Sequence, residues 1–174
     1  AVDEVQTGMG RTGTWFAYQR EGITPDIITL AKGLGGGLPL GATIGLGKAA
    51  ELLQAGSHGS TFGGSPTSTA AALAAIEVIE GEGLLAKVAA LGDHLKSEAA
   101  ALPGVKEARG AGLLIGIELF KADAKEIQQE LEKERILVNA PNPTTIRIAP
   151  ALITNHSEVE RFLQSLGKIL RIRA

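Results

Sequence analysis

Lys32 stands where an apolar run meets a glycine-rich stretch, within a segment that reads TLAKGLGGG from Thr29 to Gly37. The branched apolar residues before it predict a buried strand, and the end of such a strand fixes the first part of the lysine side chain. Glycines after it leave room for a flat molecule to approach the backbone. An amine held in this way can form an imine with a carbonyl compound. Because most lysines are surface charges, this interpretation needs support from other residues.

Asp3, Val5 and Gln6 near the start of the chain form a second candidate group. Residues two apart in a strand share a face, so Asp3 and Val5 are expected to meet one flat ligand, with Gln6 turning towards its edge. A carboxylate beside a pyridine nitrogen keeps that nitrogen protonated, and the ring can then accept electrons from a breaking Cα–H bond. Together with Lys32, this group indicates pyridoxal phosphate (PLP) chemistry.

Two further segments can hold charged groups of a ligand. The stretch from His58 to Pro66 combines hydroxyl side chains with glycines and leads into a helix start, with Ser65 expected as N-cap. Such loops bind phosphate through hydroxyls and free backbone N–H groups. Arg147 lies between two isoleucines, so a strand would turn its guanidinium away from the buried face. It is either a solvent-facing charge or a fork for a substrate carboxylate.

Two other segments resemble phosphate-binding motifs, but the residues and elements around them do not fit those motifs. Gly8–Gly13 matches G-x-G-x-x-G, but a dinucleotide fold also needs a full helix next and an acidic residue after the second strand. The expected helix, Phe16–Glu21, spans only about two turns, and Asp26 precedes the second strand. Only a long helix after Gly13 would support a nicotinamide-dependent oxidoreductase. Gly47-Lys48 lacks the flanking residues of a phosphate loop.

The composition is that of a globular protein without an obvious macromolecular target. There are 17 basic and 19 acidic residues, so a net charge of −2 predicts neither nucleic acid nor a membrane surface as partner. The chain has no cysteine, and its three histidines lack the spacing of metal ligands, so we expect no metal site. His94 and His156 are expected to be solvated on helices. Without an apolar run of about 18 residues or a signal peptide, a cytoplasmic location is the expectation.

Periodicity divides the chain into an α/β part, residues 1–82, and a small α+β part, residues 83–174. The chain begins in the middle of an expected strand and without Met, which predicts a piece of a longer protein. We expect the strands Val2–Val5, Ile27–Ala31, Ala42–Leu46, Val105–Arg109, Leu113–Leu119, Ile136–Asn139 and Thr145–Ala149. We expect helices at Phe16–Glu21, Lys48–Gln54, Thr69–Glu82, Leu84–Leu102, Ala124–Arg135 and Asn155–Ile172, with Asn155 and Glu158 as a capping box.

Five segments in this order resemble the class III aminotransferases, most closely the acetylornithine/ornithine branch: Asp3–Gly13, Pro25–Gly37, His58–Gly64, Arg109–Leu113 and Ile146–Pro150. The resemblance implies a fold type I, PLP-dependent enzyme, of which this chain is the C-terminal part of the large domain and the small C-terminal domain. It implies a homodimer with shared active sites that transfers an amino group from N2-acetylornithine to 2-oxoglutarate in arginine biosynthesis. Ornithine, succinylornithine or 4-aminobutyrate as donor, or a catalytically incomplete fragment, are the alternatives.

By this resemblance, Lys32 is the Schiff-base lysine that also moves the substrate proton, and Asp3 pairs with the pyridine nitrogen. Val5 packs on the cofactor ring and Gln6 bonds its phenolic oxygen.

The resemblance also gives roles to residues further along the chain. Thr61 is the phosphate ligand supplied across the dimer interface, with Ser60 beside it on the substrate side, and Arg147 holds the α-carboxylate of glutamate or 2-oxoglutarate. Ser65 departs from the family, which often has Asn there, and nothing in the sequence explains the difference.

Overall fold

The computed structural model describes residues 1–173, which form two compact units. The first unit ends at Ala86 and the second begins at Lys87, inside helix α2 (Leu84–Ala100). This division falls four residues after the boundary expected at residue 82. Among the described residues, no helix is both long and apolar enough to cross a membrane.

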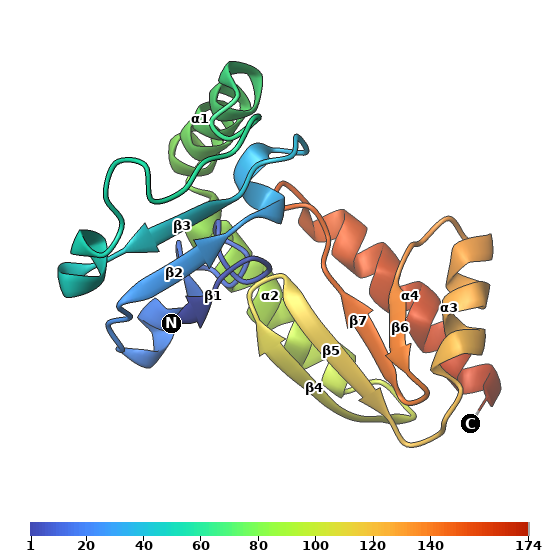
Figure 1. Cartoon of the computed structure of the whole chain (residues 1–174). Coiled ribbons are helices and arrows are strands. Elements are labelled where there is room, and N and C mark those ends of the chain that lie inside the picture. Colours follow the sequence, from blue (N-terminus) through green and yellow to red (C-terminus); the bar gives the residue numbers. More distant parts are fainter. Residues whose placement is uncertain (174) are drawn as a thin grey trace. The chain divides into compact units, whose positions relative to one another are not determined.

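The first unit contains a three-stranded sheet in the order β1-β2-β3 (Figure 1). Strand β1 runs parallel to β2, and β3 runs antiparallel to it. Ile28 and Leu30 point into the core of this unit, as the branched apolar run predicted. The strands are shorter than expected: β1 Val2–Asp3, β2 Ile27–Leu30 and β3 Ala42–Gly45.

Between β1 and β2 the chain makes a series of turns instead of a long helix. Its only helical part among the described residues is a five-residue 3-10 helix, Ala17–Glu21. Met9 adopts a left-handed backbone conformation with φ 56°, and Gly10 and Gly13 also have positive φ. The long helix that a dinucleotide-binding fold requires after Gly13 is therefore missing, as expected from the sequence.

Helix α1 (Pro66–Gly81) follows the exposed loop of hydroxyl residues. Ser65 is the N-cap residue and Pro66 opens the helix, both as predicted, but the Ser65 side chain makes no capping hydrogen bond. The backbone carbonyl of Ser65 instead accepts hydrogen bonds from the backbone N–H and the hydroxyl of Thr69, each at 3.0 Å. The alanines of α1 allow close packing, because a Cβ on Gly36 would already lie 3.6 Å from the Cβ of Ala75.

The second unit is an antiparallel sheet in the order β4-β5-β7-β6, with α2 and α4 on one face (Figure 1). Alternate residues of β5, Ile115, Ile117 and Leu119, are buried, and they pack with Ile146 and Ile148 of β7. The remaining elements are β4 Val105–Ala111, β5 Leu114–Leu119, α3 Ala124–Lys133, β6 Asn139–Asn142, β7 Thr145–Ile148 and α4 His156–Arg173.

The start of α4 shows the predicted capping box. The Asn155 side chain accepts from the backbone N–H of Glu158 at 3.1 Å, and the Glu158 carboxylate accepts from the backbone N–H of Asn155 at 2.9 Å. Two donors at the start of the helix, which would otherwise lack partners, are satisfied in this way. The sequence pattern therefore located this helix start correctly.

The predicted strand Ile136–Asn139 is wrong for its first three residues, since β6 begins only at Asn139. Local contacts from α3 already use the backbone groups of this segment. The N–H of Ile136 donates to the carbonyl of Leu131 at 2.9 Å, and the Gln128 side chain donates to the carbonyl of Val138 at 3.0 Å. Branched residues raise strand propensity, but these hydrogen bonds to α3 override it here.

Candidate active site

Lys32 and Gln6 converge at one edge of the first sheet. The Lys32 amine donates a hydrogen bond to the Gln6 side-chain oxygen at 2.7 Å, and both side chains are exposed. Strands β1 and β2 are parallel, with Asp3 paired to Thr29, so the carboxyl ends of both strands lie at the same edge. In open α/β sheets, ligands bind beyond this edge. Three predicted site residues therefore lie where a ligand is expected.

The Asp3 carboxylate is held by its neighbours. Its Oδ1 accepts from the backbone N–H of Val5 at 2.9 Å and from the hydroxyl of Thr29 at 3.3 Å. The expected strand Val2–Val5 is wrong for its last two residues, because β1 ends at Asp3 and Val5 lies in a turn. Strand periodicity therefore does not place Val5 beside Asp3; the turn does, through this hydrogen bond.

The backbone at Lys32 adopts a left-handed conformation, with φ 44°. Outside glycine this costs of order 1–3 kcal/mol and is found disproportionately at functional sites. The surrounding loop is fixed by short contacts: the N–H of Leu34 donates to the carbonyl of Ala31 at 3.0 Å, and Leu34 itself is buried. A Cβ on Gly33 would lie 3.4 Å from the Cβ of Met9. The lysine is thus presented from the first residue of a short 3-10 helix, Lys32–Gly35.

Glu4 is a buried charged residue to which sequence reasoning assigned no role. It is only 3% exposed, and its two carboxylate oxygens accept from the hydroxyl of Thr7 and from the backbone N–H of Tyr18 at 2.9 Å. The contact to Tyr18 ties the end of β1 to the far side of the turn segment and so fixes Val5 and Gln6. In the expected strand Val2–Val5, Glu4 lies on the face opposite Asp3 and Val5. An acidic residue on that buried face was the sequence signal that it has a structural role.

Ser60 and Thr61 are exposed in the loop before α1. Within the described part of the chain, neither hydroxyl is hydrogen-bonded to Lys32, Gln6 or Asp3. The structure therefore does not bring these two residues into the Lys32 group, and the phosphate-binding role predicted for Thr61 stays a prediction.

Arg147 lies on the exposed face of the second unit's sheet. It is paired across strands with Gly116 of β5 and Asn139 of β6, and its side chain is exposed, as the alternation with Ile146 and Ile148 predicted. Among residues 1–173, no ion pair joins Arg147 to a carboxylate. A guanidinium in this state can receive a carboxylate in two parallel hydrogen bonds.

The other arginine on this face, Arg109, is already engaged. It forms ion pairs with Glu107 at 2.8 Å and with Glu118 at 3.2 Å, which raise its pKa. Hydrogen bonds from Thr144 and Thr145, and then from Arg109, lower the pKa of Glu118 to about 2. Of the two arginines on this face, Arg147 is the one left for a ligand.

The α/β first unit, with Lys32 just beyond the carboxyl ends of β1 and β2, and the small α+β second unit have the architecture predicted for fold type I. Residues 1–170 match the family model for class-III aminotransferases, and the chain belongs to this family. The chain is 54% identical over 172 residues to the acetylornithine aminotransferase of Streptomyces coelicolor and 50% identical over 171 residues to that of Mycobacterium leprae.

These matches cover 97% of the chain but only 43% and 42% of the two relatives, so the chain spans less than half of their length. Solved structures agree on the fold. An ornithine aminotransferase from Toxoplasma gondii superposes with a TM-score of 0.89 at 31% identity over 98% of this chain and 42% of its own. An acetylornithine aminotransferase from Elizabethkingia anophelis gives 0.87 at 31% identity over 96% and 46%.

Proposed function

We propose that this chain is the C-terminal portion of a PLP-dependent acetylornithine aminotransferase that transfers the amino group of N2-acetylornithine to 2-oxoglutarate. The observation that carries the proposal is the contact between the Lys32 amine and Gln6 at the carboxyl edge of β1 and β2. The identity of about 50% to acetylornithine aminotransferases favours this donor over ornithine, succinylornithine or 4-aminobutyrate.

The residues present fit PLP, because an amine, an amide oxygen and a carboxylate lie at one sheet edge. Lys32 would hold its carbonyl carbon, Asp3 its ring nitrogen and Gln6 its phenolic oxygen, with Val5 against the ring. When bound, PLP supplies an acceptor for the electrons of the substrate Cα–H bond.

Lys32 has a second role as a proton carrier. The free Nζ would take the proton from the substrate Cα and deliver it to the cofactor carbon on the other side of the substrate nitrogen. The hydrogen bond to Gln6 holds Nζ at the sheet edge. The left-handed backbone of Lys32, with φ 44°, restricts where the amine can reach. Pre-positioning of this kind lowers the entropic cost of the proton transfer.

The exposed residues outside this group bind the charged ends of the ligands. Thr61 would donate to the cofactor phosphate of a partner subunit, with Ser60 beside it, in a homodimer with shared active sites. The exposed loop that carries both residues supports this assignment. Arg147, exposed and without an ion pair in the described chain, would bind the α-carboxylate of glutamate or 2-oxoglutarate.

The test is Lys32→Ala in the full-length protein. Loss of the imine-forming amine and of the proton carrier should abolish the visible absorbance of the bound cofactor and lower turnover by about 10²–10⁴-fold. Lys48→Ala, which removes another exposed lysine of the same unit, should leave both unchanged. Turnover retained by the Lys32 variant would refute the assignment, and a higher kcat/KM for ornithine than for N2-acetylornithine would refute the donor.

A further inference from the structure

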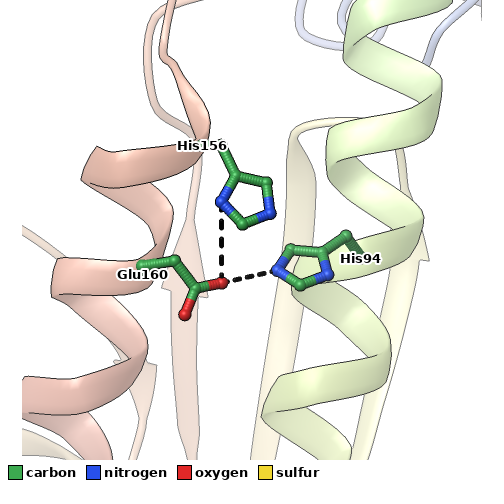
Figure 2. Close-up of side chains that lie close together, drawn as sticks. All are labelled: His94, His156 and Glu160. Atoms are coloured by element: carbon green, nitrogen blue, oxygen red, sulfur yellow. Dashed lines mark hydrogen bonds and ion pairs between the residues drawn. The ribbon is translucent and has the colours of Figure 1, made fainter.

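Three potential metal ligands lie together in the second unit, on residues to which the proposed reaction gives no role. His94 comes from α2, and His156 and Glu160 come from α4 (Figure 2). One ligand atom from each residue lies within 4.8 Å of the other two. The His94 Nε2 is 2.6 Å from the Glu160 Oε1, and the His156 Nδ1 is 3.9 Å from the same oxygen.

The fold produces this cluster from residues that are distant in sequence. His156 and Glu160 are four apart on α4, so both side chains lie on one face of the helix, one turn apart. The packing of the unit then brings α2 alongside and places the His94 ring against that of His156, with centroids 4.5 Å apart. Sequence spacing gave no sign of this pairing, which is why a metal site was not expected.

The donor set is one that borderline divalent metals prefer. Two imidazole nitrogens and one carboxylate oxygen are ligands of zinc sites with an open position, where water occupies the fourth corner of a tetrahedron. Magnesium and calcium, in contrast, select oxygen ligands. We propose that His94, His156 and Glu160 form a binding site for a divalent transition-metal ion such as Zn²⁺.

The two distances to the Glu160 carboxylate need only small adjustments to hold the ion, and all three ligand atoms lie within 4.8 Å of one another. Zinc–ligand distances of about 2.0–2.1 Å in a tetrahedron place neighbouring ligand atoms about 3.3 Å apart. The His94–Glu160 distance of 2.6 Å must therefore open by about 0.7 Å, and the His156–Glu160 distance of 3.9 Å must close by about 0.6 Å. The side chains of His94, His156 and Glu160 are 32%, 65% and 37% exposed, respectively. An ion can therefore enter from solvent and keep a water ligand.

The experiment titrates Zn²⁺ into the untagged, cofactor-loaded full-length protein in competition with a chromogenic chelator. We expect one high-affinity Zn²⁺ per chain. His94→Gln and His156→Gln should each lower its affinity by at least about tenfold, since even the loss of a residue that only supports a ligand costs that much. His58→Gln is the matched control, because His58 is an exposed histidine of the first unit and should leave the affinity unchanged.

Glu160→Gln tests the carboxylate separately, since it keeps a hydrogen-bonding group beside His94 while removing the charge. We expect it to weaken Zn²⁺ binding, with a thermal unfolding midpoint in the absence of metal close to that of the parent. Absorption bands of bound Co²⁺ in the visible range should report a four-coordinate site and disappear in both histidine variants. No binding at 100 micromolar Zn²⁺, or binding equally strong in the parent and both histidine variants, would overturn the proposal.

Discussion

The ionisation of Glu118 is coupled to the folded state. Its carboxylate accepts a hydrogen bond from the Thr145 hydroxyl at 2.7 Å and forms an ion pair with Arg109, and its pKa is lowered to about 2. A group whose pKa is lower in the folded protein stabilises the fold above its unfolded pKa of 4.5, and this contribution is lost as the pH falls from 4.5 through about 2.

Glu118→Gln should therefore flatten the acid dependence of stability. We expect the free energy of unfolding of the parent to fall more steeply between pH 5 and pH 2 than that of the variant, because only the parent must protonate this carboxylate. Urea unfolding of the full-length protein at a series of pH values measures the difference. Glu98→Gln, which alters an exposed glutamate of α2, is the control. Equal slopes for parent and Glu118 variant would contradict the prediction.

For single residues, the sequence pattern predicted the position correctly where a side chain directly follows a strand. Lys32 was expected at the end of a buried strand, and β2 ends at Leu30, two residues before it. The role of Glu4 could not be found in this way, since its partner Tyr18 lies across a turn segment that has no periodicity. The His94 cluster was missed because it depends on the packing of two helices that are distant in sequence.

At the scale of elements, one close contact fixes the distance between α2 and the β4–β5 turn. A Cβ placed on Gly92 of α2 would lie 2.1 Å from the backbone oxygen of Gly112. No side-chain rotation relieves such an overlap, because both atoms belong to or adjoin the backbone. The helix can lie on this turn only with glycine at position 92.

Gly92→Ala should consequently destabilise the second unit, although alanine is the better helix former. The added methyl group must push α2 away from the β4–β5 turn. We expect this to lower the free energy of unfolding by about 3 kcal/mol, at the upper end of the range for overpacked cores. Gly81→Ala is the matched control: it adds the same methyl group to the last residue of α1, where no atom lies within 4 Å. We expect it to be neutral or to stabilise by up to about 1 kcal/mol. Urea unfolding measures both, and equal effects would contradict the prediction.

Most elements followed from periodicity, and the exceptions have local causes. The β4–β5 hairpin and all four long helices lie within a few residues of the expected positions, since their apolar residues recur with the correct period. Ile136–Val138 was predicted to be a strand because of its branched residues. Its backbone groups are instead hydrogen-bonded to Leu131 and Gln128 of α3. A single-sequence pattern cannot show that such a competitor is near.

At the scale of the whole molecule, the chain supplies only the exposed edge of the proposed site. Asp3, Gln6, Lys32, Thr61 and Arg147 are all exposed. Cofactor sites bury most of their ligand, about 70–90% of its surface in drug-sized cases. Since the chain spans 43% of its Streptomyces coelicolor relative, we expect the walls of the site to come from further polypeptide. The isolated 174-residue chain should therefore bind PLP weakly.

Borohydride reduction after incubation with PLP, followed by peptide mass spectrometry, measures this binding. In the full-length protein we expect selective modification of Lys32 that saturates at low PLP concentration. In the isolated chain, once its cooperative unfolding has been verified, Lys32 should be modified no faster than the exposed Lys48, because only the proposed contacts of Asp3, Val5 and Gln6 would hold the cofactor beside it. Selective and saturable labelling of Lys32 in the isolated chain would show that this edge alone suffices to bind the cofactor.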